Sequence, residues 1–348
     1  IDREQLGWVV TAIIVGAGLL SPYAGTVTDR IGGKSAFQAL FVASAASFLF
    51  MAVAPVYAAM FLGAAFGAVA QAGGNPSTNK LIALHVPAGS RGVVTGIKQS
   101  GVQLGIFLGG LLLPFVAEVI GWRWALGLVS LVAIVSLVPA SLFVPRDRPD
   151  HGAGAVSGDG PLPRSIYWLA VYGFLLGFGG SVTFFLALYV EESLGRSPRL
   201  GGLAVGLAGL TAIFGRIAWA RFAERRGQFV MPLAAIAVLS VVASVALLAA
   251  TNAIVLLWVG VILIGLSSSS WNSVGMLAVM DEAGMERAGR ASGIVMLGFL
   301  IGLGIGPPLF GRSIDSTGSY DFMWMVSIGA FLLASAVALL WSRMAPRN

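Results

Sequence analysis

Long runs of apolar residues, broken by short polar stretches, fill most of the 348-residue chain. Eleven runs are long enough to cross a bilayer as helices, because about 20 apolar residues span the hydrocarbon core. The predicted spans lie near 7–28, 35–53, 57–80, 93–117, 123–144, 166–190, 201–221, 229–250, 253–277, 291–311 and 322–343. The pattern therefore predicts an all-α, polytopic helical membrane protein.

One segment interrupts this pattern for longer than a turn. Residues 145–164 contain no apolar run and are rich in Gly, Pro and Asp, which is typical of a linker. The segment separates an N-terminal half, 1–144, with five predicted spans from a C-terminal half, 165–348, with six. We expect the linker to be cytoplasmic.

A set of glycines in the first half recurs 197 residues later in the second. The matching pairs are Gly92 with Gly289, Gly96 with Gly293, Gly101 with Gly298, Gly105 with Gly302, and Gly109 with Gly306. Such a repeat predicts two related helical halves, an arrangement common in membrane transporters. Two halves of six would require one more helix before the first span, so we expect one helix of an original twelve to be missing.

These glycines follow one another at intervals of four or five residues, so on a helix they share a face. Small residues allow membrane helices to approach closely. Two interpretations stay open: the glycines serve packing alone, or they also form a smooth interface along which helices move.

Composition excludes a soluble protein. Hydrophobic residues make up 57% of the chain and charged residues 10%, whereas soluble domains carry about 25% charged residues. The net charge of +6 could suggest a nucleic-acid partner, but its distribution argues against one. Alternating spans place fourteen Lys and Arg on one side and five on the other. The positive-inside rule assigns the richer side to the cytoplasm, so we predict an inner-membrane protein with a cytoplasmic C-terminus and no nucleic-acid partner.

Enzymatic signatures are absent from the sequence. It contains no cysteine, no phosphate-cradling loop, no His/Cys metal cluster and no nucleophilic triad. We therefore expect no enzyme activity, no catalytic residue, no cofactor and no metal.

The first predicted cytoplasmic loop carries a pattern of glycines and charged residues, and a partial copy of this pattern occurs in the second half. The loop residues are Gly25, Asp29, Arg30, Gly32, Gly33 and Lys34, and the second copy contains Glu224 and Arg225. The glycines permit a tight turn, and a carboxylate suits the N-terminus of a neighbouring helix. A surface charge cluster without a further role is the alternative.

This loop closely resembles the loop signature of the major facilitator superfamily. The resemblance extends over essentially the whole chain and includes Gly121-Trp122-Arg123 at an outer turn. It implies two pseudo-symmetric helical halves, with the family's first helix absent here, that rock around a site at the membrane midplane. It also implies that the loop clasps the halves in the outward-facing state, and a monomer is expected.

Arg216 is the clearest candidate for substrate contact. It lies nine residues before Arg225, about 13 Å along a helix, so its charge reaches the interface only with difficulty. No acid lies three or four residues away. The guanidinium therefore needs an anionic substrate or an acid on another helix, and its planar fork suits carboxylate, nitrate or phosphate. Its position resembles that of the anion-binding arginine in monocarboxylate, oxalate and nitrate carriers.

Lys98 is the second charge inside a span, and its repeat equivalent is Val295. It contacts substrate, or it is an interfacial anchor. Further cavity-lining candidates are Gln71, Asn75, Gln99, Gln103, Trp271 and Asn272; buried amides can equally tie helices together.

We therefore expect a secondary transporter of a small organic or inorganic anion, in contact with the lipid bilayer and coupled to a proton or to sodium. One alternative is an efflux antiporter of the same superfamily. The Gly-Pro pair that such antiporters carry in the fifth helix occurs here only in the other half, at Gly306-Pro307. A membrane scaffold or sensor without transport is the second alternative.

Overall fold

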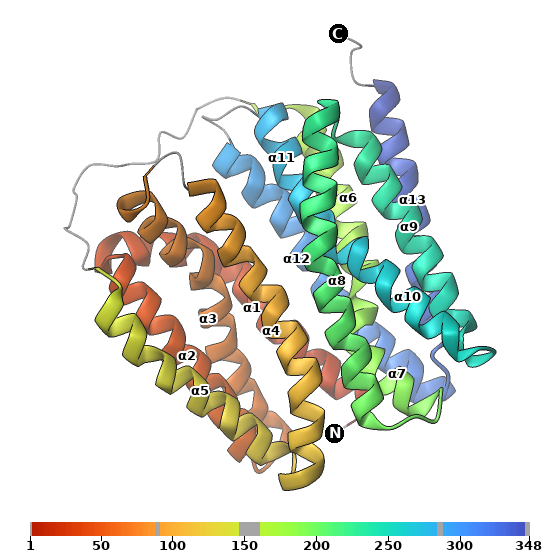
Figure 1. Ribbon diagram of the computed structural model, residues 1–348, viewed down its shortest axis with the longest axis horizontal. Coiled ribbons are helices and arrows are strands. Elements are labelled where there is room, and N and C mark those ends of the chain that lie inside the picture. The colour runs from red at the N-terminus through yellow and green to blue at the C-terminus, as the bar shows by residue number, and fades with distance from the viewer. Residues whose placement is uncertain (1, 88–90, 146–160, 284–287, 345–348) are drawn as a thin grey trace. The chain divides into compact units, whose positions relative to one another are not determined.

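A computed structural model describes residues 2–87, 91–145, 161–283 and 288–344. Within these ranges every regular element is a helix (Figure 1), as the hydropathy pattern predicts. The predicted linker, 145–164, lies mostly outside the described residues, so the division at that point stays a prediction.

The helices follow one another with short connections. Before the linker they are α1 (Arg3–Ile31), α2 (Gly33–Val53), α3 (Tyr57–His85), α4 (Arg91–Ile120) and α5 (Trp122–Phe143). After it they are α6 (Arg164–Gly180), η2 (Ser181–Phe185), α7 (Leu186–Glu192), α8 (Pro198–Arg226), α9 (Val230–Leu248), η3 (Ala249–Thr251), α10 (Ile254–Leu266), η4 (Ser268–Ser270), α11 (Trp271–Ala283), α12 (Ala288–Thr317) and α13 (Asp321–Met344).

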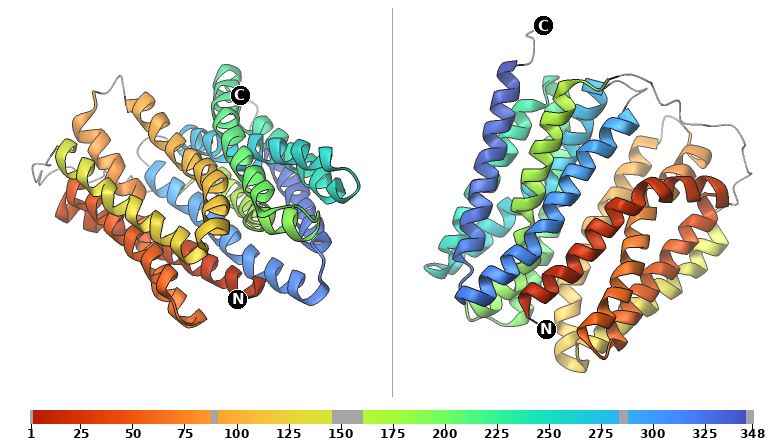
Figure 2. Two further views of the ribbon diagram at one scale, coloured as in Figure 1. Left: turned by 60° about the horizontal axis from the view of Figure 1, so that its bottom comes forward. Right: turned by 180° about the vertical axis from the view of Figure 1, so that it is seen from behind.

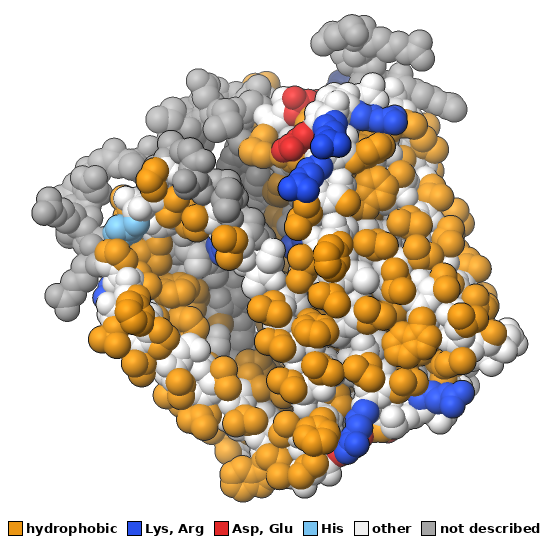
Figure 3. Space-filling model, viewed as in Figure 1, with side chains coloured by type: hydrophobic (Ala, Val, Ile, Leu, Met, Phe, Trp, Pro, Cys, Tyr) orange, Lys and Arg blue, Asp and Glu red, His pale blue; other side chains and the backbone are white. Residues whose placement is uncertain are grey.

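Eleven helical segments of the described chain are long and apolar enough to cross a membrane, which confirms the predicted number. Some are composite: α6, η2 and α7 form one segment, and α10, η4 and α11 form another. Over the second half of the chain, Figure 3 shows a mostly hydrophobic surface with most Lys and Arg near the helix ends. Lipid-facing helices have this distribution, since charge is costly in hydrocarbon.

The chain divides into two compact units. The described residues of unit 1 fall within Trp8–Val102 and Leu113–Gly154, and those of unit 2 within Asp2–Gly7, Gln103–Leu112 and Ala155–Asn348. Two helices, α1 and α4, therefore contribute residues to both units.

Unit 1 contains two helix connections of a single residue. Gly32 joins α1 to α2 with φ 86° and ψ 154°, and Gly121 joins α4 to α5 with φ 89° and ψ 152°. Both torsion pairs lie where a side chain is disfavoured, which confirms the tight turn predicted at Gly32. The hydroxyl of Ser130 on α5 donates to the carbonyl of Ala45 on α2 at 2.8 Å and joins these neighbours.

Unit 2 is held together by a close contact between α6 and α12, which lie side by side in Figure 2. A Cβ added at Gly298 would lie 2.6 Å from the carbonyl oxygen of Ala170, and one at Gly302 would collide with that of Phe174. These glycines thus allow backbone-to-backbone packing, as their spacing predicts. Their repeat counterparts Gly101 and Gly105 have no atom within 4 Å of an added Cβ. The two sets of glycines therefore do not serve the same packing.

We expect Gly302→Ala to destabilise the protein by about 1–3 kcal/mol, because the methyl group overpacks the contact with α6. The matched control is Gly105→Ala at the equivalent repeat position, where the methyl meets open space and helix propensity favours alanine by about 0.5–1 kcal/mol. Thermal unfolding in detergent measures both. A Gly302→Ala variant as stable as the parent would show that this packing is not tight.

Candidate substrate site

A membrane segment of unit 2 is broken in its middle, between α10 and α11. Ser267 has φ −112° and ψ −95°, far from helical values, and a short 3₁₀ turn follows it. The break frees carbonyl groups that an intact helix would satisfy. Inside a membrane such groups need partners from the protein. The hydroxyl of Ser267 supplies one by donating to the carbonyl of Leu263 at 2.6 Å.

Neighbouring side chains satisfy the next carbonyls. The hydroxyl of Ser270 donates to Gly265 O at 2.8 Å, and Nε1 of Trp219 on α8 donates to Leu266 O at 2.7 Å. Helix α8 approaches the break closely at Gly215, where an added Cβ would lie 2.9 Å from the Leu266 backbone. The serines at the break thus satisfy carbonyl groups that the break leaves open.

Arg216 lies on α8 beside the break. Its Nε donates to Ser269 O at 3.3 Å. The guanidinium carries five N–H donors, and the other four have no hydrogen-bond partner among the described residues; no described carboxylate forms an ion pair with it. Arg216 is half-buried. A half-buried cation therefore presents most of its donors beside a broken helix.

Two other predicted site residues begin α11, directly after the break. The Oδ1 atom of Asn272 is buried and has no hydrogen-bond partner among the described residues, a costly arrangement unless a ligand or water completes it. The Trp271 side chain is 1% exposed and packs against the rings of Tyr172 and Phe299. Trp271 therefore anchors the start of α11 by packing, while Asn272 contributes an amide oxygen without a partner among the described residues.

Lys98 lies in unit 1, on α4. Its Nζ donates to Oδ1 of Asn75 at 3.0 Å and to Oδ1 of Asn79 at 2.8 Å, both on α3. The structure thus brings together the predicted pair Lys98 and Asn75, and adds Asn79. Arg216 and Asn272 belong to unit 2, so the predicted site residues form two separate groups.

The remaining predicted amides lie on α3 and α4, the helices that carry Asn75 and Lys98. Gln71 is exposed on α3, and Gln103 is buried on the part of α4 that belongs to unit 2. The side chain of Gln99 lies outside the described residues.

The predicted loop is almost entirely helical: Gly25, Asp29 and Arg30 belong to the end of α1, Gly33 and Lys34 begin α2, and Gly32 connects the two helices. Lys34 at the start of α2 donates to Ser141 O near the end of α5 at 2.7 Å, and Arg30 is exposed. The Asp29 side chain lies outside the described residues. Glu224 and Arg225 are exposed in the last turn of α8.

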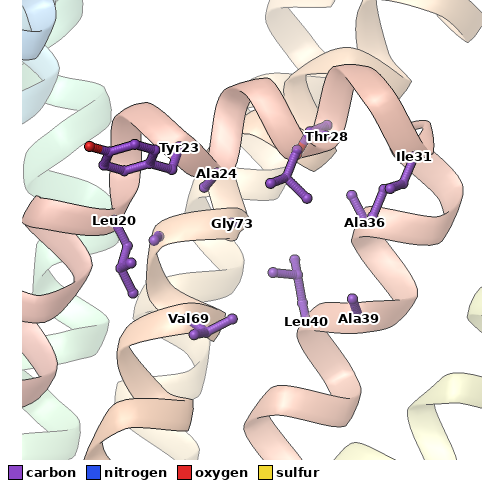
Figure 4. A pocket seen from close by; sticks show the side chains of 12 residues that line it. Leu20, Tyr23, Ala24, Thr28, Ile31, Ala36, Ala39, Leu40, Val69 and Gly73 are labelled. Atoms are coloured by element: carbon purple, nitrogen blue, oxygen red, sulfur yellow. The ribbon is translucent and has the colours of Figure 1, made fainter.

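An apolar cavity of about 190 Å³ lies within unit 1, beneath the last turns of α1. Figure 4 shows Leu20 of α1, Val69 of α3 and Leu40 of α2 around it, while the Tyr23 hydroxyl points away. Thr28 is the polar residue of this wall, and its carbonyl accepts from Lys80 at 3.3 Å. The cavity thus suits an uncharged or apolar group.

An ionic cluster at the side predicted to be external ties the first turn of α1 into unit 2. Arg3 donates through Nη2 to Glu192 Oε2 at 2.6 Å and through Nη1 to Asp315 Oδ1 at 2.8 Å. The other Asp315 oxygen accepts from the backbone N–H of Glu4 at 2.8 Å. The Tyr320 hydroxyl donates to Glu192 Oε2 at 2.6 Å, and burial, followed by this bond, raises the pKa of Tyr320 so that it stays a donor.

The backbones meet closely at the same place. A Cβ added at Gly7 would lie 2.6 Å from the carbonyl group of Pro307, and one at Gly311 would collide with the carbonyl group of Arg3. Glu192 ends α7, and Asp315 lies in the last turn of α12. No local signal pairs them with Arg3, because these contacts join residues 189 and 312 positions apart.

Comparison with known proteins agrees with this architecture. The profile described as Major Facilitator Superfamily matches residues 1–307. The chain belongs to the major facilitator superfamily. It is therefore a multi-pass membrane transporter of a solute, and the bacterial relatives indicate the cell membrane.

Two relatives and one solved structure illustrate this membership. An uncharacterized transporter of Mycobacterium tuberculosis is 29% identical over 307 residues, 85% of this chain and 67% of the relative. A probable sulfoacetate transporter of Cupriavidus necator is 25% identical over 378 aligned positions, 98% of this chain and 85% of the relative. The crystal structure of a bacterial homologue of the human lysosomal transporter Spinster has a TM-score of 0.78 at 17% identity, with 99% of this chain and 90% of the other covered, and shows the fold.

We expect Arg3→Gln to speed amide hydrogen exchange in the first turn of α1, because it removes two ion pairs that each contribute about 0.2–1 kcal/mol when partly exposed. Arg312→Gln is the control: Arg312 is exposed, near Asp315 in the sequence, and has no ion pair with a described residue. Equal exchange in the two variants would contradict the assigned role of the cluster.

Proposed function

We propose that this transporter moves a small organic or inorganic anion, monocarboxylate-like in size, and that Arg216 is its principal contact. The observation that carries this proposal is the guanidinium beside the broken helix, with four N–H donors that no described residue satisfies. Planar donor pairs of this kind match carboxylate, nitrate and related oxyanions.

The charge of Arg216 explains why an anion is preferred. A cation partly withdrawn from water is stabilised by a counter-ion, and a second cation in its place would be repelled. A bound anion also gives the site a net charge near zero, which lowers the cost of enclosing it in the membrane. Asn272 adds a carboxamide whose donor and acceptor ends can exchange by rotation.

A relative supports the same class of substrate. The Cupriavidus necator protein is named for sulfoacetate, a small dianion with a carboxylate and a sulfonate group. Its match covers nearly the whole of the present chain. Sulfoacetate is therefore a sensible first substrate to test.

The transport cycle we propose is alternating access, in which the two units change their relative arrangement around the substrate. Helices α1 and α4 contribute residues to both units, so such a change must disturb the contacts at their shared segments. The Arg3 cluster is the charged contact of this kind, and we propose that it opens when the external side opens. A proton or sodium ion remains the expected coupling ion.

Efflux of hydrophobic compounds is the second candidate function. The apolar cavity beneath the last turns of α1 favours it, because its walls suit an uncharged ligand. In that case Arg216 would stabilise only the helix break, and its charge would be irrelevant to transport.

We expect Arg216→Gln to lower the apparent affinity for sulfoacetate by roughly 10- to 100-fold, measured as uptake into proteoliposomes. A hydrogen bond to a charged group contributes about 1.5–3 kcal/mol, and the amide cannot replace the bidentate fork. Arg216→Lys keeps the charge without the planar fork, so its apparent affinity should lie between those of the parent and Arg216→Gln. Arg221→Gln is the matched control, because Arg221 is an exposed arginine of the same helix.

Uptake of sulfoacetate, simple monocarboxylates and nitrate that does not change in Arg216→Gln would contradict the anion proposal. Efflux of a hydrophobic dye, equal in the parent and in Arg216→Gln, would support the second candidate. Repeating the uptake across pH and sodium gradients identifies the coupling ion.

A further inference from the structure

A second cleft, of about 290 Å³, lies wholly within unit 1. It is enclosed by the beginning of α2, the end of α3, the beginning of α4 and the end of α5, all of which lie toward the predicted cytoplasmic side. Apolar side chains form most of its walls, including Phe37, Ile82, Val94 and Phe143. Lys98 also lines it and contributes a positive charge.

The hydrogen bonds of Lys98 leave it ready to bind an anion. An ammonium group has three N–H donors and no acceptor, and two of the donors are used by Asn75 and Asn79. Because Lys98 can only donate, both amides must turn their oxygens toward it. Their NH2 groups then face other directions, and no hydrogen bond to a described residue uses them. One ammonium N–H thus remains as a donor, and the two asparagines hold the lysine in place.

No described carboxylate neutralises this charge. Glu118 is the acidic residue of unit 1 whose side chain the structure describes. It lies 20 residues from Lys98 on the same helix, about 30 Å away along the axis. The cluster therefore has an unmet preference for a negative group, and apolar walls extend from it.

These features together specify the ligand. We propose that this cleft is a binding site for an apolar monocarboxylate, an organic acid with an aromatic or aliphatic body, whose carboxylate is held by Lys98, while Asn75 and Asn79 position the lysine. The residues of this cleft belong to unit 1, whereas Arg216 belongs to unit 2.

The depth of Lys98 favours a soluble acid over a membrane lipid. Lys98 lies seven residues beyond Arg91 at the start of α4, about 10 Å further along the helix. An anionic lipid keeps its head group at the interface and its tail in the hydrocarbon. In this cleft the order is reversed, because the positive charge of Lys98 lies further along α4 than the apolar wall residue Val94. A carboxylate that enters from the predicted cytoplasmic side with its charge foremost matches that order.

The test is calorimetric titration of the full chain in phosphatidylcholine nanodiscs with benzoate. Benzamide has the same shape without the charge, and acetate has the charge without the apolar body. We expect benzoate to bind at least about tenfold more tightly than either comparator, since a charge-assisted hydrogen bond and the apolar contact each contribute roughly this factor or more. Lys98→Met should lose this preference and Lys98→Arg should keep it.

Two further variants separate the site from other roles of these residues. Val94→Trp fills the cleft and leaves the bonds of Lys98 untouched, so it should weaken benzoate binding even if Lys98→Met fails to fold. The titrations are repeated in an Arg216→Gln background, which weakens any benzoate binding at the proposed transport site. A loss of the remaining benzoate affinity on Lys98→Met in that background then reports the cleft in unit 1 alone. Lys34→Met removes a lysine of the same unit that bonds to Ser141 and is the charge control.

Several outcomes would overturn the proposal. Benzamide binding as tightly as benzoate would show that charge is irrelevant. Equal benzoate affinity in the parent, Lys98→Met and Val94→Trp would show that Lys98 only joins α3 to α4. A parent protein that binds no benzoate would likewise show that the cleft is not a site for an apolar monocarboxylate.

Discussion

Hydrocarbon offers no hydrogen-bond partner to a peptide group, and this constraint governs the chain from end to end. Continuous helices meet it automatically. The break between α10 and α11 meets it with side chains, and Arg216 is one of them, through its bond to Ser269 O. Because one N–H is enough for that bond, the other four N–H donors of the guanidinium have no partner among the described residues. Stabilising an irregular backbone and presenting positive charge are therefore properties of the same residue, and removing it affects both.

Close helix contacts depend on residues without side chains. In unit 2, Gly298 and Gly302 bring α12 against the backbone of α6, where contact replaces the hydrophobic drive that lipid cannot supply. The first half repeats the glycine spacing but leaves Gly101 and Gly105 without such neighbours. Sequence repetition thus records common ancestry of the halves more faithfully than it records common packing.

Much of the architecture could be predicted from the sequence because its causes are local. Hydropathy gives the eleven spans, and the glycine pattern of the first loop gives the single-residue turn at Gly32 and the family. Arg216 and Lys98 stand out because charge inside an apolar run is expensive. Their partners could not be predicted, since Ser269 and Asn79 come from other helices. The Arg3 cluster is out of reach for the same reason, as is the sharing of α1 and α4 between units.

The single-residue turns at Gly32 and Gly121 also affect how the chain links the two units. A connection of one residue keeps the ends of the two helices that it joins close together, both between α1 and α2 and between α4 and α5, so that each pair forms a helical hairpin in the chain. The first arm of each hairpin is a helix shared by both units. Each turn therefore joins a helix that is shared by both units directly to a helix that lies in unit 1 alone.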